Sequence, residues 1–179
     1  EVDTHMSKNN EWGAVAYLAQ SIYGRCISST LCTEVGINNN STYITGIGAE
    51  AGSSYNGATA NSYDTTFGMR ASTTGNIYGI YDMSGGAYEY VMGVYTNTIG
   101  ESGFSSLPDT KYYNNYTETS YTEHALTETK NWYSDSAGFV NSINPWFMRG
   151  GNYGNGTYAG VFYFSINDGN SYSNYSSRL

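Results

Sequence analysis

The side chains that could carry acid–base chemistry are few in this chain. Asp82 and Glu89 lie close together in a segment rich in tyrosine and glycine, and a pair of carboxyl groups can act as general acid and general base. A structural role is favoured for both. Asp82 is expected to accept hydrogen bonds from turn amides, and Glu89 is expected to pair with Arg149 or Arg178. No catalytic residue is therefore assigned.

The cysteines and histidines do not form a recognisable metal motif. Cys26 and Cys32 are the two cysteines of the chain, and the sequence leaves open whether they form a short-loop disulfide or remain free thiols. Neither His5 nor His124 lies near them, which disfavours a shared metal site. Calcium remains an alternative cofactor because loop carboxylates and carbonyls suit it, although no D-x-D-x-D-G run is present. No other cofactor is expected.

The composition suggests a binding protein that works outside the cell. Charged residues make up 12% of the 179 residues, and the chain contains 20 tyrosines and 22 glycines with a net charge of −8. Nucleic acids and anionic membranes are disfavoured as partners because they need clustered cations, and Lys and Arg are scattered. No apolar run approaches the roughly 20 residues of a membrane span, so direct membrane insertion is not expected.

The pattern along the first half predicts one helix followed by long loops. Asn9 or Asn10 can cap a helix over 11–23, and Gly24 suits the position after its end. Apolar residues recur there at helical spacing and are expected to face the core: Trp12, Val15, Ala16, Ala19 and Ile22. From Gly36 to Ala71 the chain is polar and glycine-rich, which predicts long loops with short strands.

The second half reads as strands separated by another long excursion. Ser84-Gly85-Gly86 predicts a tight turn before a strand within 77–95. Residues 100–135 are polar, and a short helix near 123–133 is an option. Alternation over 161–166 predicts a strand, and Asn167-Asp168-Gly169 predicts a hairpin turn to a last strand that reaches Arg178. The expected fold class is α+β, loop-rich, with small antiparallel sheets.

Four segments, in order, resemble the formylglycine-generating-enzyme (sulfatase-modifying factor) family. Glu11-Trp12 with Ala16 resembles the family's EAEWEYAA helix. Residues 76–91, NIYGIYDMSGGAYEYV, are similar to its NxxGLYDMSGNVWEW signature, and this match is long and specific. Residues 149–153, RGGNY, resemble RGGSW, and the ending 176–179, SSRL, resembles the terminal GFR. The resemblance spans most of the chain.

This resemblance implies a fold but not the enzyme. It implies a single C-type-lectin-like domain over 1–179, without the family's usual N-terminal strands upstream of residue 1. Asp82, Glu89, Arg149, Gly150, Gly151 and Arg178 then belong to the structural motif. The enzymes carry a pair of reactive, copper-binding cysteines near their C-terminal segment, and here that segment has none. Without a thiolate there is no soft copper ligand and no nucleophile, so oxidase activity is the least favoured alternative.

The segment 149–179 is also similar to the variable region of proteins diversified by retroelements, which are surface proteins of bacteria or phages, some of them pilin-like. In such systems template adenines are randomised, so Asn codons become Tyr, Ser, Asp and others. Most of the segment is Gly, Asn, Tyr or Ser. The resemblance implies a hypervariable ligand-binding region with these candidate contacts: Asn152, Tyr153, Asn155, Tyr158, Tyr163, Ser165, Asn167, Asp168, Tyr172, Asn174 and Tyr175.

The strand over 161–166 indicates how such a surface would be presented. Phe162, Phe164 and Ile166 would form a fixed apolar face, while Tyr163 and Ser165 would point outward together with Val161. Tyrosine, asparagine and serine are the residues of antibody paratopes. The expected function is a receptor or adhesin domain at the surface of a bacterium or on a phage, with a protein or glycan ligand. The main alternative is a structural, pilin-like module.

Overall fold

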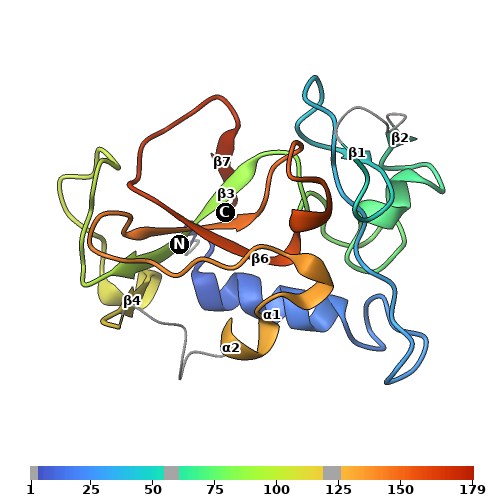
Figure 1. Ribbon diagram of the computed structural model, residues 1–179, viewed down its shortest axis with the longest axis horizontal. Coiled ribbons are helices and arrows are strands. Elements are labelled where there is room, and N and C mark those ends of the chain that lie inside the picture. The colour runs from blue at the N-terminus through green and yellow to red at the C-terminus, as the bar shows by residue number, and fades with distance from the viewer. Residues whose placement is uncertain (1–3, 55–60, 119–125) are drawn as a thin grey trace.

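A computed structural model of the chain describes residues 4–54, 61–118 and 126–179, so the prediction for His124 and part of the predicted helix over 123–133 lie outside the described residues (Figure 1). The structure is α+β. Its helices are α1 (Asn9–Ala19) and α2 (Leu126–Thr129), with 3₁₀ turns at Gly68–Ala71, Thr110–Tyr112, Trp132–Ser134 and Gly156–Tyr158. Its strands are β1 (Ile47–Gly48), β2 (Asn61–Ser62), β3 (Tyr88–Tyr95), β4 (Asn114–Tyr116), β5 (Trp146–Gly150), β6 (Gly160–Asn167) and β7 (Tyr175–Ser177).

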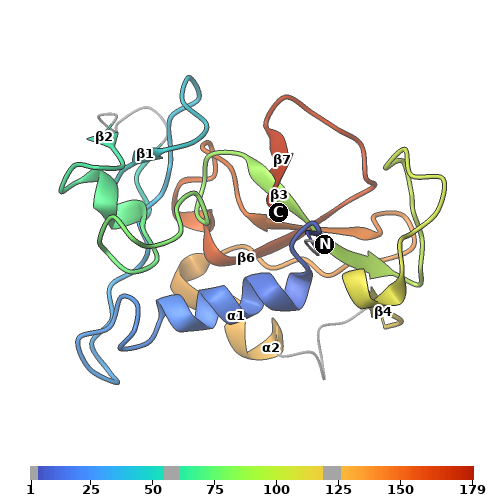
Figure 2. The same cartoon turned by 180° about the vertical axis from the view of Figure 1, so that it is seen from behind.

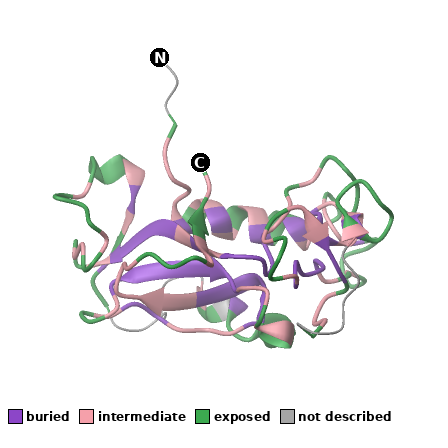
Figure 3. Ribbon diagram, turned by 90° about the horizontal axis from the view of Figure 1, so that it is seen from above, coloured by how far each residue is buried: buried purple, intermediate pink, exposed green. Residues whose placement is uncertain are grey.

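A five-stranded mixed sheet forms the centre of the molecule. Its order is β4-β3-β5-β6, and β7 also pairs with β3. β5 lies antiparallel between β3 and β6, whereas β4 and β7 run parallel to β3 and pair with its C-terminal and N-terminal halves. The sheet is thus mixed rather than antiparallel as predicted. Its strands are largely buried, and the exposed residues gather in the loops (Figure 3).

The two faces of the sheet are covered differently. One face packs on α1, where Trp12, Ala16 and Ala19 meet Val91 of β3, Phe147 of β5, and Phe162 and Phe164 of β6. Burial of this apolar surface is the main stabilising contribution to the fold. The loop 168–174 arches over the side of the sheet that lies away from α1 (Figures 1 and 2). There, Met92, Val94, Tyr113 and Trp146 form a smaller cluster.

The predicted helix lies in the right place but its ends differ. It begins at Asn9, and the cap is Lys8, whose N–H donates to the Glu11 carboxylate at 2.8 Å. Neither Asn9 nor Asn10 is the cap; Asn9 is buried and its side-chain oxygen accepts a hydrogen bond from Arg149. The helix ends at Ala19, so Ile22 lies outside it and is 64% exposed, contrary to the prediction that it joins the core.

Gly24 is required for a different reason from the one predicted. It does not adopt a positive φ. Instead the chain folds back so tightly on the end of α1 that a Cβ at this position would lie 2.4 Å from the carbonyl oxygens of Leu18 and Ala19. Cys26 and Cys32 close the following loop with a disulfide bond, which decides between the two alternatives that the sequence left open.

Most of the other predicted features are confirmed, but the predicted connection from β6 to the last strand is not. Long loops with short strands fill the described parts of 36–71, and Gly85 and Gly86 form the turn before β3 with φ values of 74° and 67°. The predicted hairpin after β6 is wrong. The side chains of Asn167 and Asp168 accept hydrogen bonds from the amides of Gly169 and Asn170, and the chain then crosses the sheet, where β7 pairs with β3.

Among the described residues, no helix combines the length and the apolar character that crossing a bilayer demands.

Candidate functional site

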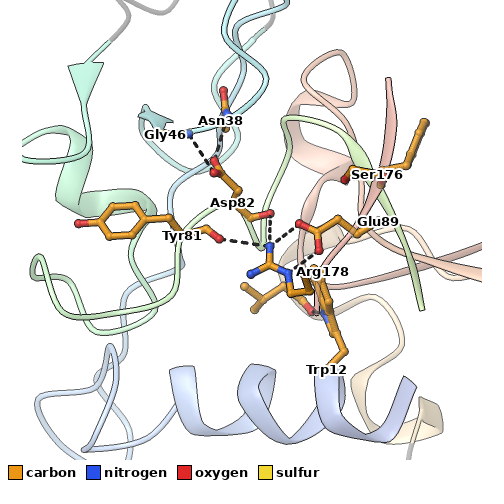
Figure 4. Close-up of polar contacts among 10 residues, drawn as sticks. Trp12, Asn38, Gly46, Tyr81, Asp82, Glu89, Ser176 and Arg178 are labelled. Carbon is orange, nitrogen blue, oxygen red and sulfur yellow. Dashed lines mark hydrogen bonds and ion pairs between the residues drawn. The ribbon is translucent and has the colours of Figure 1, made fainter. Parts of the chain in front are cut away.

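Asp82 joins the residue 76–91 segment to the loop region before it. Its backbone has a φ of 61°, which directs the carboxylate toward residues 38–46. One oxygen accepts from the Asn38 side chain at 3.0 Å and the other accepts from the Gly46 N–H at 2.9 Å (Figure 4). The prediction that Asp82 accepts a hydrogen bond from a backbone amide is therefore confirmed, and the amide belongs to a distant loop.

Glu89 and Arg178 form the ion pair that anchors the C-terminus. The guanidinium of Arg178 bonds both Glu89 oxygens and also donates to the carbonyls of Tyr81 and Asp82 at 3.2 Å each (Figure 4). It lies 5.2 Å from the ring of Trp12. Burial raises the pKa of Glu89, while the bonds from Arg178 act in the opposite direction. Of the two partners predicted for Glu89, Arg178 is the one observed.

Arg149 lies in the core instead. Its guanidinium donates to the side-chain oxygen of Asn9 at 2.9 Å and lies 5.8 Å from the rings of Trp12 and Phe164. Burial lowers the pKa of Arg149 to about 10. Nearby, burial and the charge of Glu34 raise the pKa of Asp135 to about 8. Asp135 was not predicted from the sequence, because a single aspartate among small residues of a polar loop carries no signal of burial.

Gly150 and Gly151 have the structural role expected of them. The carbonyl of Gly150 accepts from the Gly85 N–H at 3.0 Å, so this turn holds the start of β3. Both glycines have positive φ values, of 81° and 72°. A Cβ on Gly151 would lie 2.9 Å from Ala159. Any other residue would be strained in conformation and crowded at this position.

The predicted contacts in 152–158 form one turn beside the loops of 36–71. Tyr158 is 61% exposed and is free to contact a ligand. The asparagines mostly shape the turn, since Asn155 accepts from the amide of Asn152 at 2.7 Å and Asn152 accepts from that of Gly154 at 3.0 Å. Tyr153 is partly buried, and its N–H donates to Gly86. Hydrogen bonds between residues of the turn thus contribute most of its stabilisation.

The predicted faces of β6 are correct for Phe162, Phe164 and Tyr163 but wrong for Val161, and the predicted exposure of Tyr163 and Val161 is wrong. Phe162 and Phe164 pack toward α1 as expected. Tyr163 lies on the other face but is only 5% exposed, because the ring of Tyr88 packs against it at a centroid distance of 5.9 Å. Val161 is buried in the main core. Neither residue can act as an outward contact, while Ser165 is partly exposed.

The remaining predicted contacts lie in the loop 168–174 and its ends, which a tyrosine from β3 holds in place. The hydroxyl of Tyr90 donates toward the Asn167 side chain and bonds the carbonyl of Asn170 at 2.7 Å. Tyr172 is exposed, and its ring packs 5.0 Å from that of Tyr175. The carbonyl of Asn174 accepts from Tyr88, and Asp168 bonds the amide and side chain of Asn170.

Between this loop and the sheet lies an open cavity of about 260 Å³. Its apolar lining comes from Met6, Tyr90, Phe104, Trp146 and Tyr175. Its polar lining comes from four serines and a glycine, namely Ser102, Gly169, Ser171, Ser176 and Ser177. Of the ligand contacts predicted from the sequence, only Tyr175 lines the cavity. Tyr90 and Trp146 carried an aromatic signal, but a sequence does not reveal which face of a strand a loop covers.

The cavity is electrically neutral at its wall. None of its lining residues is charged. Burial is the main cause that raises the pKa of Tyr90 and of Tyr175, with a further contribution from the nearby Asp168 carboxylate. Both phenols therefore stay protonated at neutral pH; the Tyr90 hydroxyl donates to the loop, whereas the Tyr175 hydroxyl accepts from the Asn167 side chain and keeps its proton to donate.

Metal-ligating side chains do not converge in the part of the chain that the structure describes, where no three His, Cys, Asp or Glu residues meet. His5 bonds the carboxylate of Glu11 at 3.2 Å, next to Lys8. This pair belongs to the helix start. The disulfide uses both cysteines of the chain.

Comparisons of the chain with models of known families, with curated proteins and with solved structures found no match.

Proposed function

We propose that this chain is a ligand-binding domain with a C-type-lectin-like fold of the formylglycine-generating-enzyme branch. It is displayed on a bacterial surface or a phage particle as a receptor or adhesin. Residues 149–179 form its recognition region, and a retroelement diversifies the exposed positions of that region. The ligand is a protein or a glycan, and no chemistry is performed on it.

One observation carries the proposal: the four segments that resemble the family meet around Trp12. The indole N–H of Trp12 donates to the carbonyl of Val161 at 2.8 Å, and the guanidinium groups of Arg178 and Arg149 lie 5.2 and 5.8 Å from its ring. Glu89 of the 76–91 segment completes the group through Arg178. Short motifs matched by chance have no reason to converge in space, whereas motifs of one fold do.

The distribution of exposure supports recognition by the C-terminal segment. The ends of the segment are fixed, since Arg149 is buried and Arg178 is paired with Glu89. Between these ends, Tyr158 and Tyr172 present exposed rings on turns braced by asparagine side chains. Exposed tyrosine on a rigid frame provides a large contact area at a low cost in side-chain entropy, as in antibody paratopes.

The disulfide supports a function without catalysis. The family's oxidase chemistry needs two reactive thiols near the C-terminal segment, and both cysteines of this chain are bonded to each other in the loop after α1. A disulfide sulfur is neither a thiolate nucleophile nor a thiolate copper ligand.

A structural, pilin-like module is the second candidate, and a surface near the end of α1 favours it. Leu18, Tyr23, Tyr78 and Ile80 surround a shallow hollow there and are all exposed. Contiguous apolar surface of this kind is typical of protein interfaces. Polymerisation of the chain together with an invariant C-terminal sequence would support this function over ligand recognition.

Sequencing of the last hundred or so bases of the gene across many cells of the source population tests the first proposal. We expect substitutions at codons of exposed or partly exposed positions such as Tyr158, Tyr172 and Ser165, with Phe162 and Phe164 unchanged. The aromatic pair is the internal control, because both rings are buried in the core. An invariant segment would remove diversification and leave a binder of fixed specificity or a structural module.

A further inference from the structure

The cavity beneath the loop 168–174 has the properties of a small-ligand site. We propose that it binds one ring of a neutral carbohydrate. This inference rests on the proposed function and names its ligand class. The volume of about 260 Å³ lies just below the roughly 300–1,000 Å³ of sites for drug-sized molecules, which suits a ligand of one ring.

The apolar wall can stack against a sugar. Phe104, 44% exposed, is the ring of the wall that a sugar can stack on. It packs 5.7 Å from the buried ring of Trp146, which also has Tyr90 at 6.3 Å and is fixed because its N–H donates to the carbonyl of Ile99 at 2.9 Å. Rings held in this way need no ordering when a ligand binds, which lowers the entropic cost of association. The C–H groups of a pyranose ring pack well on aromatic surfaces of this kind.

The polar wall supplies groups that match sugar hydroxyls. Ser171 and Ser177 are exposed where they line the cavity, and their hydroxyls make no hydrogen bond within the described part of the chain. A serine hydroxyl donates one hydrogen bond and accepts others, as does each hydroxyl of a sugar. An aliphatic side chain of a protein ligand would leave these serines without partners, which favours a carbohydrate over an apolar peptide.

Because no charged residue lines the cavity, neutral sugars are favoured over acidic sugars as its ligands. An acidic sugar would lose hydration without gaining a cation, because the cavity wall carries none and Asp168 lies close enough to affect Tyr90 and Tyr175. A quaternary ammonium ion would be attracted by the rings, but it would form no hydrogen bond with the serines. Acidic glycans and choline are therefore the discriminating probes.

A second hollow allows the ligand to continue beyond one ring. A cavity of about 490 Å³ is lined by Thr4, His5, Met92 and Leu107 among others, and it shares Met6 and Phe104 with the first. A disaccharide or longer glycan could thus place one ring in the first hollow, against Phe104 and Tyr175, and the next in the second hollow beyond Phe104. This arrangement makes Phe104 the side chain that both rings would contact.

An array of neutral and acidic glycans, followed by calorimetric titration, tests the inference. We expect binding to at least one neutral glycan, with a dissociation constant on the order of 0.1–1 mM for a ligand of one or two rings. We expect no binding to its sialylated form or to choline. Binding confined to acidic glycans, binding to choline instead of sugars, or no neutral glycan bound would each overturn the inference.

Two variants locate the binding. Phe104→Ala should weaken binding about 10-fold or more, because Phe104 lies on an exposed loop and its loss should leave the fold intact. Phe67→Ala is the matched control, since Phe67 is similarly exposed on the loops of residues 36–71 and lines neither cavity. Ser171→Ala should also weaken binding, by about 5-fold, through the loss of a hydrogen bond. Unchanged binding in both Phe104→Ala and Ser171→Ala would place the sugar elsewhere and overturn the inference.

The two proposals can fail separately. A C-terminal segment that varies among cells, in a chain that binds no neutral glycan, would leave diversified recognition standing and remove the sugar site. Glycan binding that Phe104→Ala weakens, with an invariant segment in the population, would establish the sugar site and remove the diversification.

Discussion

The ends of the C-terminal segment and its middle are held by different chemistry. At the ends, Arg149 is buried against aromatic rings and Arg178 is bonded to the buried carboxylate of Glu89. In the middle, the turns are held by asparagine side chains bonded to their own backbone and by the hydroxyl of Tyr90. The ends depend on distant parts of the chain, whereas the 152–158 turn depends mostly on itself.

This difference shows how one segment can be both fixed and replaceable. A buried charge that loses its partner is costly, so the residues at the two ends tolerate little change. An exposed side chain on a turn that others support contributes little to stability, so its identity is free to serve recognition. The stability of variants at the ends and of variants in the middle can be measured separately. If both kinds of variant lose similar stability, the contrast between the ends and the middle does not hold.

The largest effect is expected at the ion pair. Arg178→Met should lower the free energy of unfolding by about 3–5 kcal/mol, because it leaves the Glu89 carboxylate buried without its partner. The measurement is chemical denaturation at neutral pH. Arg70→Met is the control, since Arg70 pairs with the exposed Glu50 and its loss should cost less than about 1 kcal/mol.

A second substitution checks the cause. In the double variant Arg178→Met with Glu89→Gln, no charge remains to be compensated, so part of the lost stability should return. A loss in Arg178→Met no larger than that in Arg70→Met would mean that the C-terminus is not anchored by this pair, and the contrast between ends and middle would not hold.

A smaller effect should appear as a dependence of stability on pH. Asp135 has a pKa raised to about 8 in the folded protein, from 3.8 in an unfolded chain, and burial raises the pKa of Glu34 to about 7. Between these values the folded state holds protons that the unfolded state has released. The contribution of these two groups to stability is therefore greatest below about pH 4. It falls as the pH rises to about 8, by up to about 1.4 kcal/mol per pH unit for each proton released, and is level above.

Asp135→Asn should remove most of this dependence of stability on pH. Asparagine keeps the oxygen that accepts from the Phe162 N–H at 2.9 Å and cannot ionise. Glu34→Gln should remove a smaller part, since the charge of Glu34 is one cause of the raised pKa of Asp135. The measurement is denaturation at several pH values, and a slope that survives in Asp135→Asn would assign the dependence to other groups.

The sequence predicted the parts of the fold that depend on local pattern. The helix of Trp12, the turn at Gly85 and the strand of Phe162 and Phe164 follow from spacing and from the backbone demands of glycine. The predicted pairing of Glu89 with an arginine is also confirmed, because two of the segments that resemble the family supply the carboxylate and Arg178.

The errors concern contacts between distant segments. Tyr163 alternates as a surface residue would, but the covering ring comes from Tyr88 on another strand. β7 was expected beside β6, yet the anchoring of Arg178 at Glu89 directs it to β3. The cavity beside Phe104 brings together side chains from the N-terminal stretch, β3, β5, β7 and two loops, which no local pattern could indicate.

The smallest effect on stability is expected where the effect on recognition should be largest. Tyr158→Ala and Tyr172→Ala should each change the free energy of unfolding by less than about 0.5 kcal/mol, because both rings are more than half exposed. Trp146→Ala is the contrasting variant, since its ring is buried and its loss should cost about 3–5 kcal/mol. Denaturation of the three variants side by side measures the contrast. A cost for Tyr158→Ala close to that of Trp146→Ala would show that the exposed tyrosines support the fold, and a segment whose surface supports the fold cannot be freely diversified.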